Sequence, residues 1–239
     1  MKSLHLTEMM SDVPQSASDR FFIGGRPNMP AHYAVPECGL CTRGMTFYFQ
    51  VVFPDWHPWK GRHLLLFACT RCQTKSSLIP RMVEGFVKAD VTQDFLRDYF
   101  DYFRFLSFAD EASEIRSEYV PVLQFVRWSP VVVEDSGDPF NKVEGVPYWY
   151  LGDEEPASFP GESESCFLMQ LLEGYEFRKE PDAPRQTVLK YSNNGGVIGH
   201  EPSLMDEYEL FLANSVYIFG PKQYMEIEGK PVVYVIVQH

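Results

Sequence analysis

Two cysteine pairs have the spacing of a metal site. Cys38 and Cys41 form one C-x-x-C pair, and Cys69 and Cys72 form a second after 27 intervening residues. Each pair places two sulfur atoms on one side of a tight turn, and two such turns supply the four thiolates that bind Zn²⁺ tetrahedrally. The spacing therefore predicts a zinc site. Because cysteine fills all four positions and none is left for water, we expect the zinc ion to be structural.

Two alternative readings of these cysteines stay open at this point. One is that they are simple thiols, and the other is that one pair is a redox pair. Redox chemistry needs a C-x-x-C at the start of a helix that follows a strand, and neither pair has that context. The fifth cysteine, Cys166, lies in an apolar segment and is expected to be a core residue.

The segments around the two pairs indicate how they meet. The aromatic and β-branched run 46–53 predicts a buried strand, and the apolar run 63–68 predicts a second one after a turn. One cysteine pair precedes the first strand and the other follows the second strand. A hairpin made of these strands therefore returns both pairs to the same end of the sheet.

Most of the remaining chain is predicted to form strands. Residues 1–20 are polar and predict a flexible leader, 21–239 a single domain, and 134–165 an acidic loop. Helical spacing of aromatic residues predicts one amphipathic helix over 92–106 with Thr92 as its N-cap. Together these patterns predict an α+β fold with mostly antiparallel sheet and few helices. Strand patterns occupy 119–128, 131–133, 167–172, 187–191, 208–219 and 231–238.

A weak internal repeat runs through the chain. Gly25-Arg26-Pro27 and Gly145-Val146-Pro147 lie 120 positions apart, and so do Gln50 and Gln170 in two apolar segments. Residues 65–67 and 217–219 could form the next matching pair if the second half carries an insertion. The pattern indicates two duplicated halves, about 21–133 and 134–239, around one core. The alternative is coincidence among common residue types.

The charge balance favours a cationic partner. The chain has 239 residues, of which 21 are Lys or Arg and 33 are Asp or Glu, so its formal net charge is −12. Such a charge disfavours direct binding to nucleic acid or to an anionic membrane, because carboxylates repel phosphate. No signal peptide or apolar run of bilayer length is visible, so a cytoplasmic location is expected.

Carboxylates cluster in the second half of the chain. Each cluster alone is typical of a solvated surface, but their accumulation predicts a negative face that captures a basic protein. The usual enzyme motifs are missing, and His200 follows a glycine-rich stretch that is best read as a turn between strands. The predicted partner-binding residues are Asp153, Glu154, Glu155, Glu162, Glu164, Asp206, Glu207 and Glu209.

The first ordered residues resemble the opening of the YwqG-like family, a bacterial family of unknown function. The resemblance rests on the run 23–30, the pair Cys38-Gly39-Leu40-Cys41 and the strand with a central Gln50, and it continues patchily at 199–202 and 209–219. Residues 21–75 are also similar to the N-terminal part of the programmed-cell-death-protein-2 family, which is implicated in escorting a basic ribosomal protein. The resemblance implies an α+β, partly duplicated fold and a role in protein binding.

Three functions are compatible with these observations. The favoured one is a non-enzymatic, immunity-type protein that binds and neutralises a basic toxin such as a nuclease; some YwqG-like proteins are thought to protect bacteria from toxins. The second is a chaperone-like escort of a basic ribosomal protein. The third is an enzyme whose dispersed active site gathers Cys166, His200 and carboxylates. A divergent acidic second half suits a dedicated toxin partner better than an invariant ribosomal one.

Overall fold

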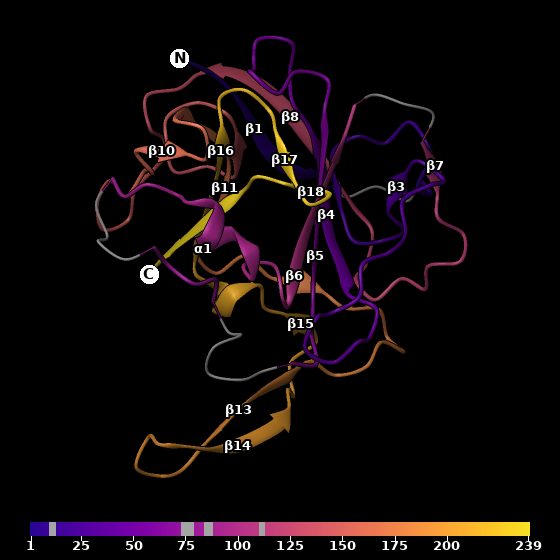
Figure 1. Cartoon of the computed structure of the whole chain (residues 1–239). Helices are drawn as coiled ribbons and strands as arrows, with labels where there is room; N and C mark the ends of the chain where they lie inside the picture. The colour runs from indigo at the N-terminus through magenta and orange to yellow at the C-terminus, as the bar shows by residue number, and fades with distance from the viewer. Residues whose placement is uncertain (10–12, 73–78, 84–87, 110–112) are drawn as a thin grey trace.

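A large antiparallel sheet dominates the computed structural model, which describes residues 1–9, 13–72, 79–83, 88–109 and 113–239 (Figure 1). The neighbouring strands pair antiparallel, and helix is scarce, so the predicted α+β class with mostly antiparallel sheet is confirmed. In spatial order the strands are β19 (Tyr234–Gln238), β16 (Ser215–Pro221), β11 (Ser163–Leu171), β9 (Lys142–Val143), β1 (Lys2–Met9), β8 (Val126–Glu134), β2 (Phe22–Ile23), β4 (Thr46–Val52), β5 (His63–Ala68) and β6 (Phe103–Phe108), with β10 (Ser158–Phe159) added to β11.

Shorter elements decorate this sheet. The helical ones are α1 (Gln93–Arg97) and the 3₁₀ turn η1 (Phe211–Ala213). Four separate two-stranded pairs are β3 (Asn28–Met29) with β7 (Glu114–Ile115), β12 (Phe177–Arg178) with β15 (Glu207–Tyr208), β13 (Thr187–Tyr191) with β14 (Val197–Pro202), and β17 (Glu226–Ile227) with β18 (Lys230–Pro231).

The core lies inside the curl of the sheet, where strands are covered on both faces. Every residue of β4, β5 and β16 is buried. This explains why their sequences read as continuous apolar runs instead of alternating ones. The predicted strand 63–68 coincides with β5, the strand 46–53 with β4, and the two pair as the predicted hairpin.

The predicted helix over 92–106 is wrong in its extent. Thr92 is the N-cap, with its hydroxyl accepting from the Phe95 amide at 3.2 Å, but α1 ends at Arg97. Residues 103–108 instead form β6, which pairs with β5 along its whole length. The aromatic residues at 95, 99 and 100 fit a helical period, whereas Phe103 and Phe105 fit the period of a strand, and pairing with a buried neighbour decides for the strand.

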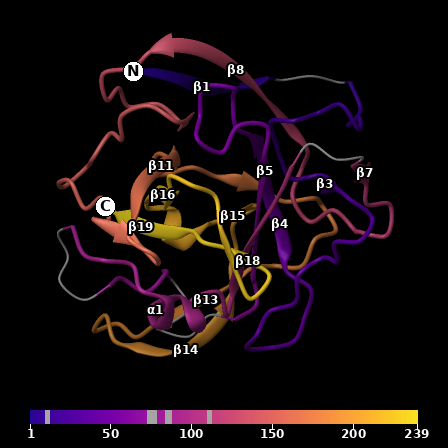
Figure 2. The same ribbon diagram turned by 45° about the horizontal axis from the view of Figure 1, so that its top comes forward.

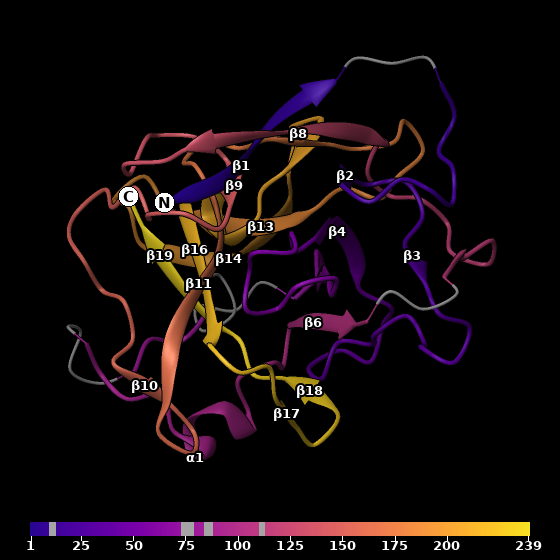
Figure 3. The same ribbon diagram turned by 90° about the horizontal axis from the view of Figure 1, so that it is seen from above.

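The predicted flexible leader is also wrong. Residues 2–9 form β1, which lies in the middle of the sheet and pairs with β8 on one side and β9 on the other (Figure 3). Residues 3–6 are buried, with Leu4 and Leu6 in the core. Further along, Asp19 forms an ion pair with Arg127 of β8 at 2.8 Å. The polar composition of this segment therefore hid a strand whose pairing partners lie 118 to 139 positions away in the sequence.

Equivalent strands follow one another in the same order from the centre of the sheet to each of its two edges. β2, β4, β5 and β6 follow one another on one side, and β9, β11, β16 and β19 do so on the other, with β1 and β8 at the centre. Phe22 lies opposite Gln50 in the first half, and Lys142 opposite Gln170 in the second, at the same offset of 120. Both glutamine strands carry a register shift at the same place, between the residues three and one positions before the glutamine.

The connecting loops repeat at the same offset. Gln50 accepts a hydrogen bond from the Asn28 amide at 3.2 Å, and Gln170 accepts one from the Tyr148 amide at 2.8 Å. Gly24, with φ +57°, and Glu144, with φ +59°, occupy equivalent left-handed positions. These contacts agree with the predicted internal repeat. The boundary between the two halves differs from the predicted one. β1 and β8 occupy equivalent central positions in the sheet, so β1 begins the first half and β8 begins the second.

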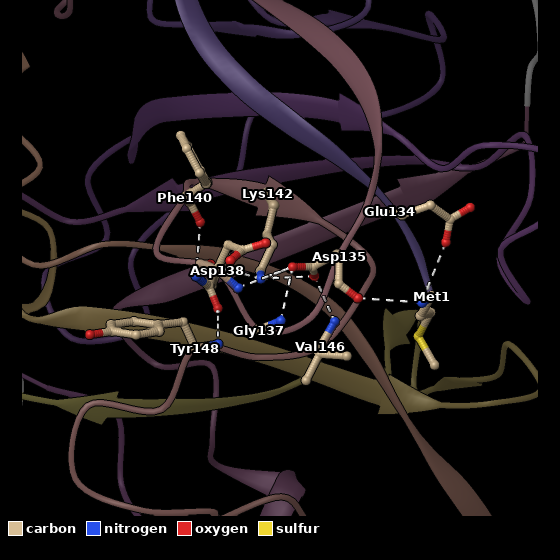
Figure 4. Close-up of polar contacts among 10 residues, drawn as sticks. Met1, Glu134, Asp135, Gly137, Asp138, Phe140, Lys142, Val146 and Tyr148 are labelled. Carbon is tan, nitrogen blue, oxygen red and sulfur yellow. Dashed lines mark hydrogen bonds and ion pairs between the residues drawn. The ribbon is translucent and has the colours of Figure 1, made fainter.

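A buried ion pair fixes the loop that leaves the centre of the sheet (Figure 4). Lys142 and Asp135 are both fully buried, and their charged atoms lie 2.8 Å apart. The Asp135 carboxylate also accepts from the backbone amides of Gly137, Asp138 and Val146, so its lone pairs are well satisfied. In the first half Gln15, 120 positions earlier, accepts from the Arg26 amide in the same way.

Candidate metal centre

The β4–β5 hairpin brings the two cysteine pairs together. Cys38 and Cys41 lie before β4, and Cys69 and Cys72 lie after β5. Because Thr46 pairs with Ala68, the start of β4 lies beside the end of β5. The predicted arrangement at one end of the sheet is therefore confirmed.

Backbone hydrogen bonds hold both cysteine turns against the chain segment that enters β6. The Gly39 amide donates to the Asp101 carbonyl, and the Cys69 amide donates to the Tyr102 carbonyl, each at 2.7 Å. A Cβ at Gly39 would lie 3.1 Å from the Asp101 oxygen, so this turn favours a residue without a side chain. The site thus joins three segments that are distant in sequence.

The four sulfur atoms have the separations of a tetrahedral metal site. All lie within 4.8 Å of one another. Cys38 and Cys72 are 3.8 Å apart, and Cys41 and Cys69 are 3.7 Å apart. A tetrahedral ion with Zn–S bonds of about 2.3 Å requires sulfur separations of about 3.8 Å, whereas a disulfide requires about 2.05 Å. The four residues present therefore fit a tetrahedral metal ion.

The local environment favours the protonated form of Cys69 and Cys72 when no cation is bound. Burial raises the pKa of Cys69 to about 11, and burial and the neighbouring thiols raise the pKa of Cys72. Burial acts in the same direction on Cys41, but hydrogen bonds from the Arg43 amide and the other thiols outweigh it and lower its pKa. A divalent ion would favour four thiolates here and would release protons on binding.

Amide hydrogen bonds to sulfur would also stabilise the thiolate form. The backbone amides of Arg71 and Cys72 donate to the Cys69 Sγ at 3.4 and 3.3 Å. Such donors favour the charged form of the sulfur. With four protein thiolates as ligands, a four-coordinate ion would have no open position for water or substrate, which is the arrangement of structural metal sites.

The remaining cysteine lies beside a histidine but is not activated by it. Cys166 Sγ is 3.5 Å from His57 Nε2. The Trp59 amide donates to His57 Nδ1 at 2.8 Å, so the ring proton is on Nε2 and faces the Phe167 carbonyl at 3.2 Å. Burial lowers the pKa of His57 to about 4, and burial and two nearby carboxylates raise the pKa of Cys166 to about 12. At neutral pH these shifts make His57 a weak base and favour the thiol form of Cys166.

His200, the other residue considered for a dispersed active site, lies in β14 of the β13–β14 hairpin, where it is exposed. The preceding glycine-rich stretch is the turn between these two strands, as predicted.

Five of the eight predicted partner-binding carboxylates lie around β10 and the start of β11. Asp153 forms an ion pair with Lys88 at 3.6 Å, and Glu164 forms one with Lys222 at 2.7 Å. These pairs are largely exposed, so they contribute little to stability and leave the carboxylates accessible. The five residues are Asp153, Glu154, Glu155, Glu162 and Glu164.

The other three carboxylates, Asp206, Glu207 and Glu209, lie in and beside β15. Asp206 forms an ion pair with Lys179 at 3.3 Å. Glu209 exposes its side chain, while its backbone is bonded to the side chain of Gln186. Figure 1 draws β10 and β15 well apart, so the eight residues form two groups and not one surface.

Sequence reasoning missed the Asp135–Lys142 pair and the Glu144 loop. The 120-residue offset was the signal that could have found them, since it relates Gln15 to Asp135 and Gly24 to Glu144. Single residues carry no such information, because an aspartate and a lysine in a loop are ordinarily exposed.

Comparison with known proteins yields no relative. No family model matches the chain, and no curated protein matches it. In the part of the chain that the structure describes, no helix combines the length and apolar character needed to cross a membrane.

Proposed function

We propose that this chain is a non-enzymatic, acidic protein-binding module of the immunity type, which binds a basic toxin such as a nuclease and neutralises it. The observation that carries the proposal is the crowding of carboxylates around β10. Burial raises the pKa of Glu155, and the negative charge of Asp153 raises it further. This concentration of negative charge would attract a cationic partner over a long range and speed its approach.

The expected chemistry of the partner supports the same function. A nuclease needs cationic side chains where it holds phosphates, and those side chains are complementary to a carboxylate surface. A chain with a net charge of −12 would attract such a protein over a long range and would speed its capture. Occupying the phosphate-binding surface would block the toxin.

The metal is part of the proposal. We assign one zinc ion to Cys38, Cys41, Cys69 and Cys72, in a structural role. Zinc is favoured because four thiolates at tetrahedral separations are its usual structural ligand set. Membership of the YwqG-like family also remains a proposal, supported by the repeated role of the central glutamine in both halves.

Affinity purification of the full chain from its native cell tests the function, with mass spectrometry to identify what co-elutes. We expect one basic protein, whose nuclease activity on a labelled RNA or DNA substrate falls to background when one equivalent of the chain is added. Replacing Asp153 and Glu155 by Asn and Gln should slow association. The matched control is Glu114→Gln on β7, which lies away from both carboxylate groups in Figure 1.

Other outcomes would contradict this function. Recovery of a ribosomal protein alone would favour the escort function. A co-eluting nuclease that keeps its full activity at saturating concentrations of the chain would exclude neutralisation. Association that is equally fast at low and high salt would remove the electrostatic argument, because charge-steered capture slows as salt screens it.

A further inference from the structure

The second half of the repeat contains an insertion. Phe47 pairs with Phe67 in the first half, and Phe167 pairs with Phe219 in the second. The offset between equivalent residues thus grows from 120 in the first strand to 152 in the second. The second half therefore carries 32 more residues between these two strands than the first half does. The fold is complete without them in the first half, so packing of the sheet does not require them.

Residues 187–202, equal in number to half of the insertion, form an arm that projects from the body. Within the described residues its two strands, β13 and β14, pair only with each other. Figures 1 and 2 both draw the arm on the side of the molecule opposite β1 and β8. An isolated two-stranded hairpin is at best marginally stable in water. A binding partner would supply the packing that the body does not.

The base of the arm is anchored beside the cysteine site. The Thr187 amide donates to the carbonyl of Thr70, which lies between Cys69 and Cys72, at 2.9 Å. Gln186 is buried and exchanges two hydrogen bonds with the Glu209 backbone, at 2.8 and 2.9 Å. The cysteine turns thus fix the point from which the arm projects.

The arm and the loop after it expose apolar side chains next to carboxylates. Ile198 is 62% exposed, Leu204 82% and Met205 60%. Asp206 and Glu209 follow directly and are exposed. Exposed apolar side chains accompanied by charged ones are typical of protein interaction sites. Along this segment the apolar side chains precede the exposed carboxylates at 206 and 209.

We propose that the arm and the loop 203–209 form the docking surface for the partner, a protein that presents cationic side chains around an apolar patch. The proposal rests on the proposed function: the carboxylates at 206–209 make direct contact with the partner, and the group around β10 contributes to its long-range attraction. A second copy of this chain is a poor occupant, because it carries the same carboxylates at 206–209 and has the same net charge of −12. The exposed apolar side chains would supply affinity, and the carboxylates would supply selectivity.

Site-specific photo-crosslinking of the full chain in its native cell tests this assignment. Benzoylphenylalanine replaces Ile198 in the arm or, as a control, Val132 in β8, which is 54% exposed on the opposite side of the molecule. We expect the probe at 198 to form a crosslink to a basic protein that mass spectrometry identifies, and the probe at 132 to form none. With the identified protein, Ile198→Asp and Leu204→Asp should each weaken binding at least tenfold, and Val132→Asp should leave it unchanged.

The alternatives give distinct results. A crosslink from position 198 to a second copy of the chain would overturn the proposal and make the arm a self-association element. A basic partner that binds all three aspartate variants equally well would also overturn it, yet would leave the proposed function standing. The aspartate variants that lose binding must keep the melting temperature and metal content of the wild type. As a further variant, replacement of residues 188–201 by two glycines should also abolish binding.

Discussion

Removing the buried charge of Lys142 should destabilise the protein severely. In Lys142→Met the ammonium group is lost, and with it two hydrogen bonds to the Asp135 carboxylate and one to the Asp138 carbonyl. The carboxylate stays fully buried and keeps only backbone amides as partners. Breaking a buried pair in this way costs about 3–5 kcal/mol. For a chain of this size that corresponds to a fall in melting temperature of roughly 6–20 °C.

Chemical denaturation followed by tryptophan fluorescence measures this loss. The double variant Lys142→Met Asp135→Asn should recover at least half of it, because no uncompensated charge remains. Lys222→Met is the matched control: its ion pair with Glu164 is 62% and 75% exposed, so its loss should cost less than about 1 kcal/mol.

The pH dependence has a defined sign. Burial acts to raise the pKa of Asp135, but the hydrogen bonds from Lys142 and three backbone amides outweigh it and lower the pKa below 3.8. The ion pair therefore stabilises the fold above that pH, and its contribution is lost as the pH falls through the folded-state pKa. The gap between wild type and Lys142→Met should close in acid. A gap below about 1 kcal/mol at pH 7 would refute the reasoning for a buried pair.

Three further predictions concern the metal, the repeat and a buried carboxylate. Cys72→Ser should reduce bound zinc, measured by elemental analysis, from one equivalent per chain to less than about a tenth of an equivalent. It should also lower the melting temperature, because structural zinc contributes folding free energy. An unchanged melting temperature would mean that the site is not structural. Gln50→Leu and Gln170→Leu should each cost about 1–3 kcal/mol in urea denaturation, because each removes two hydrogen bonds made by a fully buried side chain. A tolerated substitution in either half would contradict the equivalence of the two loops. Glu144→Gln should stabilise the protein increasingly as the pH rises from about 5 to about 8. Burial raises the pKa of Glu144 to about 7, so ionising this carboxyl in the folded state costs free energy that the variant avoids. Equal melting temperatures for the wild type and the variant across this pH range would refute the raised pKa.

The sequence by itself determined the features that depend on local pattern. The spacing of the two C-x-x-C pairs, with strand patterns between them, was sufficient to place four sulfurs at one end of a hairpin. Such a hairpin is a local structure, and its ends meet wherever it packs. The 120-residue offset between Gln50 and Gln170 likewise indicated a repeat, since equivalent positions meet equivalent physical demands.

Tertiary structure alone decided which polar segments are buried and which strands are neighbours. Residues 2–9 read as a leader because their polar composition shows no long-range partner, yet pairing with β8 and β9 puts them at the centre of the sheet. The segment 103–108 satisfied a helical period as well as a strand period, and only the buried edge of β5 selected the strand. Lys142 and Asp135 can be buried because each compensates the other's charge. This favourable interaction exists only in the folded chain, where the two side chains lie side by side.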